Sequence, residues 1–297
     1  MKAIERLNWW LEAIAKRGLS LNAAIKYREE LKKKGAKDAT CYIQSALSMF
    51  GNRRVAYEMS SAIFDEIEKA DLASCVELPC NMIRLPHPQI FLLVKQPDGR
   101  IQYEGVIQEI MIEGERSLQL TDHMYSSLLL MPRTEDCEEA KVYHALNATN
   151  EITKTYREDW NEDWEAVTNT WNLRAVKLAL FLMGTKDYKD IMVPAEFTSG
   201  KRNRNKPDYL KHEGLLRIVG GRFESALKAY NDWIPSERHE ASGEPAGRTV
   251  KPHIRAGHFH LYWTGKGREI PKVLFIHPCL VGADTEEEVE IQRTVRA

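Results

Sequence analysis

The chain has 297 residues, of which 43% are hydrophobic and 29% are charged, and its formal net charge at pH 7 is -1. This length is sufficient for one large domain or two small ones with a buried core. The near-neutral charge excludes attraction of nucleic acid or membranes by the whole surface, so such a partner would have to bind a local patch.

The N-terminal segment MKAIERLNWWLEAIAKRG is amphipathic, and its acidic residues Glu5 and Glu12 interrupt the apolar run that a signal peptide needs. No run in the chain approaches the roughly 20 apolar residues of a membrane span. The five cysteines are scattered and never form a C-x-x-C pair, which favours reduced thiols and argues against a zinc site. We therefore expect a cytoplasmic protein of the host cell with no membrane partner.

Residues 1–74 are predicted to form a helical N-terminal portion, because short helical patterns there are separated by glycines. The first three helices are expected over residues 4–18, 20–35 and 38–51. A fourth is expected where Val55, Met59, Ile63 and Ile67 recur at intervals of four residues. A small bundle is the favoured interpretation, and a helix-turn-helix that binds DNA is the alternative.

Residues 75–297 are predicted to form an α+β body, which is either a second domain or continuous with the helical portion. From about Val76 the apolar and polar residues alternate, as they do in strands. The runs Ile90–Lys95 and Ile101–Ile112 flank Gln96-Pro97-Asp98-Gly99, whose residue types suit a tight turn. Further apolar runs follow to Met131, so we expect an antiparallel meander.

A long helix is predicted over residues 157–183. Its apolar seam, at steps of three and four residues, consists of Trp160, Trp164, Val167, Trp171 and Leu178. The seam could anchor a partner, because Trp is enriched at interface hot spots. Packing against the sheet is the favoured interpretation, and the apolar end of the helix, residues 178–183, should be buried in either case.

A short basic loop follows, with the cations Lys201, Arg202, Arg204 and Lys206. Four cations in one loop could contact phosphate, so weak nucleic-acid binding is assigned to this loop.

Near the C-terminus, two strand-like runs, Gly257–Trp263 and Lys272–Ile276, are joined by Thr264-Gly265-Lys266-Gly267, which predicts a β-hairpin rich in histidine. Because side chains alternate along a strand, His258, His260 and Tyr262 should share one face. Phe259, Leu261 and Trp263 should take the opposite face, toward a core.

Three kinds of site fit this hairpin. The pair His258 and His260, with His253 and His277 nearby, has the spacing of metal ligands on a strand, but no carboxylate lies close in sequence, so we predict no metal and no cofactor. The His, Arg, Lys and Tyr side chains also suit a metal-independent ribonuclease that acts on RNA directly.

The third kind of site, a recognition surface for an extended polypeptide, is favoured because it needs no missing ligand. We therefore lean against an enzyme and assign no catalytic residue, while a structural protein without any site remains a further alternative. The predicted partner-binding residues are His253, Arg255, His258, His260, Trp263 and Arg268.

A resemblance is carried by the pattern P-H-x-R-x-G-H-x-H-x-x-x-T-G-x-G-R from Pro252 to Arg268, followed by I-x-P-x-x-V-G from Ile276 to Gly282. It resembles the C-terminal hallmark of a family carried by phages and plasmids that includes a type V-A anti-CRISPR protein. Phe259 stands where the family pattern would have Trp. The resemblance carries over no catalytic residue.

The resemblance implies a mobile-element regulator that recognises the nascent N-terminal peptide of the type V CRISPR nuclease. It further implies that the message under translation is then lost, in proximity to the ribosome and RNA. The predicted fold is thus α+β, with a helical N-terminal portion, an antiparallel sheet packed by a long helix, and a C-terminal hairpin rich in histidine.

Overall fold

The computed structural model describes residues 2–15, 33, 54–112, 114–122, 126–131, 141–142, 145–146, 162–195, 212–221, 223–225, 253–277 and 279–281. The helices are α1 (Ala3–Ala15), α4 (Ser61–Lys69) and α6 (Glu162–Gly184), with the 3-10 turns η2 (Ala73–Glu77) and η3 (Cys80–Met82). The strands are β1 (Val55–Ser60), β2 (Gln89–Lys95), β3 (Ile101–Ile112), β4 (Glu115–Asp122), β5 (Ser126–Met131), β6 (Tyr188–Val193), β7 (Gly214–Val219), β8 (His253–Arg255), β9 (His258–Thr264), β10 (Ile270–Ile276) and β11 (Cys279–Val281).

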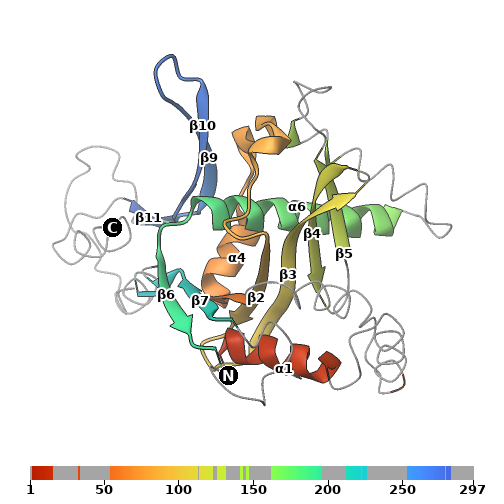
Figure 1. Ribbon diagram of the computed structural model, residues 1–297. Coiled ribbons are helices and arrows are strands. Elements are labelled where there is room, and N and C mark those ends of the chain that lie inside the picture. Colours follow the sequence, from red (N-terminus) through yellow and green to blue (C-terminus); the bar gives the residue numbers. More distant parts are fainter. Residues whose placement is uncertain are drawn as a thin grey trace, which may run out of the picture.

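A seven-stranded sheet in the order β5-β4-β3-β2-β1-β7-β6 forms the centre of the molecule (Figure 1). The predicted α+β class and the antiparallel meander are confirmed, because β2, β3, β4 and β5 pair antiparallel in sequence order. The expected turn before β3 is closed by a hydrogen bond that the Gly99 amide donates to the Gln96 carbonyl (2.8 Å). Gly99 has a φ of 82°, which glycine adopts without strain.

The predicted fourth helix is corrected at its start, because Val55–Ser60 is strand β1 and the helix α4 begins only at Ser61. The spacing of Val55, Met59 and Ile63 by four residues is a multiple of the strand period of two, so it fits a strand as well as a helix. Ser60 marks the change, since its side chain accepts a hydrogen bond from the Ile63 amide (3.4 Å) as an N-cap.

The central strand β1 makes the sheet mixed, whereas the prediction was purely antiparallel. It pairs parallel with β2 on one side and with β7 on the other. Residues on both sides of position 74 thus contribute to one sheet. Apart from residue 33, the helices expected over 20–35 and 38–51 lie outside the described residues, as do residues 147–161 before α6.

Helices cover the two faces of the sheet. α1 lies on one face, where its Ala3 amide donates to the Glu58 carboxylate (2.9 Å) and Arg6 pairs with Glu104 through two hydrogen bonds (2.7 and 2.9 Å). α4 and α6 lie on the other face. Tyr57 and Tyr103 directly precede Glu58 and Glu104, so their side chains point to the face opposite α1. Both tyrosines belong to the core that α4 and α6 share.

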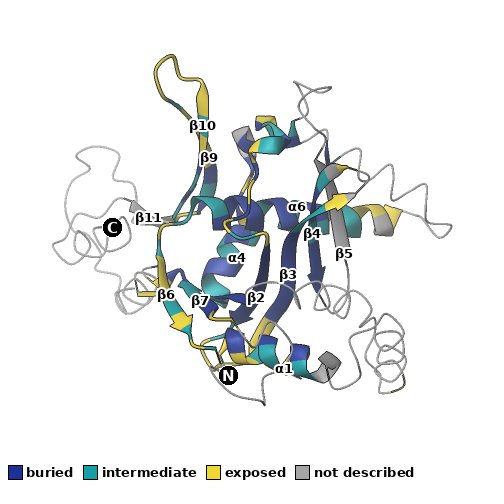
Figure 2. Ribbon diagram, in the orientation of Figure 1, coloured by how far each residue is buried: buried dark blue, intermediate teal, exposed yellow. Residues whose placement is uncertain are grey.

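The long helix α6 crosses this second face and packs on β4, β5 and α4 (Figure 1). Leu178 and the following residues to Leu182 are buried, as expected of its apolar end (Figure 2). Trp171 is half-buried against the core, and the predicted seam residue Trp160 lies outside the described residues. None of the described helices has the length and apolar character that a membrane crossing requires.

Candidate functional site: the hairpin of β9 and β10

β9 and β10 form a two-stranded antiparallel sheet that projects away from the seven-stranded sheet (Figure 1). Their register runs from the pair Thr264 and Ile270 at the turn to the pair His258 and Ile276 at the base. In the turn, the Arg268 amide donates to the Gly265 carbonyl (3.1 Å), and Arg268 has a φ of 56°.

One face of the hairpin base is buried in the core. Phe259 is 1% exposed, and its ring lies edge-on to Phe275, with the centroids 5.1 Å apart. Phe275 in turn contacts Phe181 of α6 edge-on (5.4 Å). The fit is close, because a Cβ atom added at Gly184 would lie 2.9 Å from the Val273 carbonyl oxygen. The hairpin base is therefore fixed against the end of α6.

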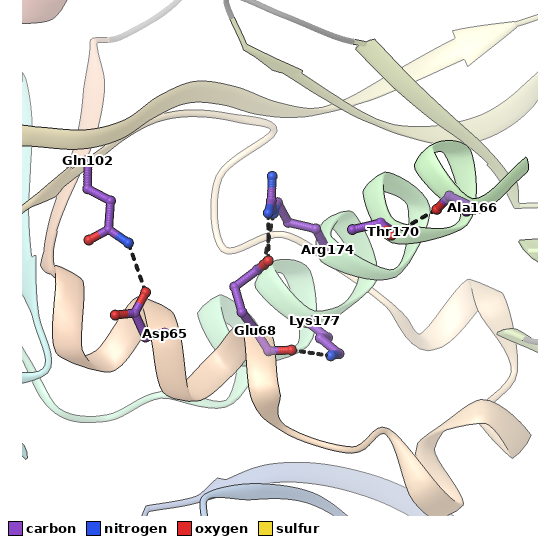
Figure 3. A network of polar contacts seen from close by, with 7 residues as sticks. All are labelled: Asp65, Glu68, Gln102, Ala166, Thr170, Arg174 and Lys177. Carbon is purple, nitrogen blue, oxygen red and sulfur yellow. Dashed lines mark hydrogen bonds and ion pairs between the residues drawn. The ribbon is translucent and has the colours of Figure 1, made fainter. Parts of the chain in front are cut away.

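The two helices next to the hairpin base, α4 and α6, are joined to each other by an ion pair (Figure 3). The Arg174 guanidinium donates two hydrogen bonds to the Glu68 carboxylate (2.9 and 2.6 Å), and Lys177 donates to the Glu68 carbonyl (2.6 Å). Arg174 also lies over the Trp171 ring, 4.6 Å from its centroid. Two helices that both touch the hairpin region are thus held together.

The opposite face of the hairpin is exposed and carries an aromatic stack. The rings of His260 and Tyr262 lie nearly parallel, 4.2 Å apart. Both side chains are exposed, as the predicted alternation requires. The expected core position of Trp263 is wrong, since this side chain is 48% exposed. The physical reason is that the hairpin projects beyond the rest of the molecule. Near its turn, residues on both faces are therefore exposed to solvent (Figure 2).

The histidines do not converge on one point. His277 lies on the buried side, near the rings of Phe275 (5.3 Å) and Phe223 (6.2 Å). His258 and His260 point to the opposite face of the hairpin. His258 pairs with Ile276, and successive side chains alternate between the two faces, so His277 lies on the face opposite to His258. Within the described residues, no group of three His, Cys, Asp or Glu side chains could hold a metal ion.

Burial lowers the pKa of His277 below its ordinary value of 6.5, and the charge of Asp187 offsets part of this shift. Its Nδ1 atom is buried without a hydrogen-bond partner among the described residues. His277 is therefore neutral in the folded protein at pH 7 and lies half-buried beside the aromatic core residues Phe275 and Phe223.

The other predicted partner-binding residues lie at the hairpin or beside it. His253 and Arg255 are in β8, which pairs with β11 through Val281 and Cys279. Arg255 is exposed. Arg268 is exposed at the turn of the hairpin. The basic loop with Lys201, Arg202, Arg204 and Lys206 lies outside the described residues.

Sequence reasoning did not find a pocket of about 280 Å³ beside β10. Three separate segments line it, namely Leu78 with Met82, the end of α6 from Met183 to Lys186, and Pro271–Leu274 of β10. The sequence pattern of any one segment could not predict this pocket, because it forms only where the three segments meet.

Comparison with known proteins gives one family. A model of the AcrVA2-like family, described as the anti-CRISPR type V subtype A2 family, matches residues 57–283. No curated protein matches the chain. No solved structure matches it either.

Proposed function

Since this chain belongs to the AcrVA2-like family of type V, subtype A2 anti-CRISPR proteins, we propose that it recognises a polypeptide segment of a type V CRISPR nuclease. Family membership assigns an anti-CRISPR function, and with it an interaction with the CRISPR machinery. In the proposal, the recognised segment is the nascent N-terminus of the nuclease. Its capture lowers expression of the nuclease through loss of the message under translation.

One observation carries the proposal, namely the exposure of three large side chains on the distal part of the hairpin. Tyr262 is 38% exposed, Trp263 48% and Ile270 59%. Large aromatic side chains supply much of the binding energy at interface hot spots. Their position on a projecting hairpin suits contact with an extended chain.

The polar residues of the same region would add direction to this contact. Arg255 presents a planar guanidinium that can bind a carboxylate or a carbonyl group through two hydrogen bonds. The stacked imidazole of His260 offers further hydrogen bonds from the same face as Tyr262. His253, His258 and Arg268 complete the proposed partner-binding set, and each acts by contact.

The test uses a reporter whose message begins with the coding sequence of the nuclease N-terminus. Trp263→Ala, Arg255→Ala, and the double change His258→Ala with His260→Ala should each abolish message loss while unfolding stays cooperative. Loss of one such anchor costs about 2 kcal/mol or more of binding. Synonymous recoding of the reporter should leave the effect of the wild-type protein intact, because the peptide is read and the RNA sequence is not.

Two matched controls are available in the chain. Trp9 on α1 is 50% exposed, so Trp9→Ala removes a tryptophan of equal exposure far from the hairpin. Lys189→Ala removes an exposed cation from β6. Both variants should retain activity. Rescue of the message by recoding, or cleavage of naked RNA that depends on His258 or His260, would instead identify a ribonuclease.

A further inference from the structure

The hairpin has only two strands, so each strand has one outer edge. In an antiparallel pair, alternate residues direct both their N–H and their C=O groups away from the partner strand. The contacts at the base of the hairpin reveal which residues these are.

On β9 the odd-numbered residues face outward. The Gly257 amide donates to a carboxylate oxygen of Glu66 on α4 (3.5 Å), and the Phe259 amide donates to the Asp71 carbonyl (3.4 Å). Leu261 and Trp263 have the same parity, so their N–H and C=O groups also point away from β10.

The outer edge of β10 is closed to a further strand. Residues opposite each other share this orientation, so Val273 and Pro271, which pair with Leu261 and Trp263, face outward as well. The Val273 carbonyl lies against Gly184 at the end of α6. Pro271 has no N–H group to donate, and proline of this kind is typical of protected edges.

Beyond Phe259 the outer edge of β9 makes no hydrogen bond to the described residues, although η2 packs beside this strand and Leu261 is only 8% exposed. Among the residues that the structure describes, the outward amides of Leu261 and Trp263 have no hydrogen-bond acceptor of their own. One outward carbonyl, that of Leu261, lies 3.1 Å from the Nδ1 atom of His260. A carbonyl oxygen has two lone pairs, so this contact leaves room for a second donor.

We infer that an extended segment of the partner polypeptide adds to β9 as a third strand, through the outward backbone groups of Leu261 and Trp263. This inference rests on the proposed function and states how that site binds. Alternate side chains of the added strand would lie beside Trp263 on one face and beside the His260–Tyr262 stack on the other.

Charge indicates the chemistry of the segment. The hairpin and β8 carry the cations Arg255, Lys266, Arg268 and Lys272 against one acidic residue, Glu269, whereas the whole chain has a net charge of -1. Near the turn, where Lys266, Arg268 and Lys272 lie, this excess complements carboxylates of the segment, whereas Glu66 and Asp71 at the base of the β9 edge disfavour them there. The occupant is therefore an extended segment with carboxylates toward the hairpin turn and an apolar residue placed beside Trp263.

Hydrogen exchange on the full-length protein tests the inference without any substitution. The probe is a synthetic peptide of the nuclease N-terminus. In the free protein the amides of Leu261 and Trp263 should exchange faster than those of His260 and Tyr262, and they should become protected when the peptide binds. The amides of His260 and Tyr262, which point toward β10, should be protected in both states.

Substitutions give a second test. Trp263→Pro removes the outward N–H group together with the side chain, whereas Trp263→Ala removes only the side chain. Binding of the peptide should weaken by about a further tenfold in the proline variant, the value of roughly one hydrogen bond. Pro271→Ala restores a donor to the outer edge of β10 and should leave binding unchanged.

The outcomes separate this inference from the proposed function. If the wild-type protein binds the peptide but the amides of Leu261 and Trp263 stay unprotected, or Pro271→Ala changes binding, the edge assignment is wrong and the proposed function stands. If the wild-type protein does not bind the peptide at all, both are overturned.

Discussion

His277 shows how one half-buried residue can make stability depend on pH. The folded protein favours its neutral imidazole, since burial lowers the pKa, while the unfolded chain takes up a proton near the ordinary value of 6.5. Below that value the unfolded state binds more protons, so the free energy of unfolding decreases as the pH falls. Stability from this residue is therefore present above pH 6.5 and is lost on acidification.

We predict that His277→Phe reduces the loss of stability between about pH 7 and pH 5. Thermal unfolding of wild type and variant at both pH values measures the effect, with about 1.5–2 °C in Tm for each kcal/mol in a protein of this size. His212→Gln removes an exposed histidine and is the control, which should keep the wild-type dependence. An equal acid loss in the His277 variant would show that another group is responsible.

Single residues also mark where sequence reasoning succeeded and where it failed. Alternation along β9 correctly predicted that Phe259 and Leu261 are buried, because local parity decides which face a side chain takes. It failed for Trp263, because a side chain is buried only where other parts of the protein pack against that face of the strand. How far a hairpin projects is a tertiary property that no local pattern contains.

At the scale of elements, the contact between the end of α6 and β10 fixes the hairpin. Gly184→Ala would place a methyl group 2.9 Å from the Val273 carbonyl oxygen, so the helix and the strand must move apart. We predict a loss of about 1–3 kcal/mol in unfolding free energy, as is typical of overpacking. Chemical denaturation measures the loss, and hydrogen exchange should show faster exchange in β10.

Gly221→Ala is the matched control for this prediction. A Cβ atom at Gly221 has no heavy atom within 4 Å, so the added methyl group should cost nothing. Equal stability of the Gly184 variant and the wild type would mean that the hairpin base tolerates displacement.

Whole elements were predictable in proportion to how local their signals are. The meander was predicted correctly because its turns and alternation lie in neighbouring residues. The boundary between β1 and α4 was wrong, because a spacing of four residues fits both structures. The pocket beside β10 was missed, since residues from three distant segments form it.

At the scale of the molecule, the net charge of -1 limits any binding of nucleic acid. We propose that the basic loop binds RNA only weakly and without sequence preference, with a slope of about -2 to -4 in a plot of log affinity against log salt. Arg202→Ala together with Arg204→Ala should nearly abolish this binding in a filter or fluorescence titration. Tight binding at high salt would place the nucleic-acid surface elsewhere.

The parallel pairing of β1 with β7 has a consequence for the order in which the protein acquires its structure. Arg217 of β7 donates a hydrogen bond to the Tyr57 hydroxyl of β1 (2.7 Å), and these residues are 160 positions apart. The centre of the sheet therefore cannot close during synthesis until β7 has left the ribosome. Until then β1 presents a bare edge, which makes nascent chains that have not yet released β7 prone to aggregation and dependent on chaperones.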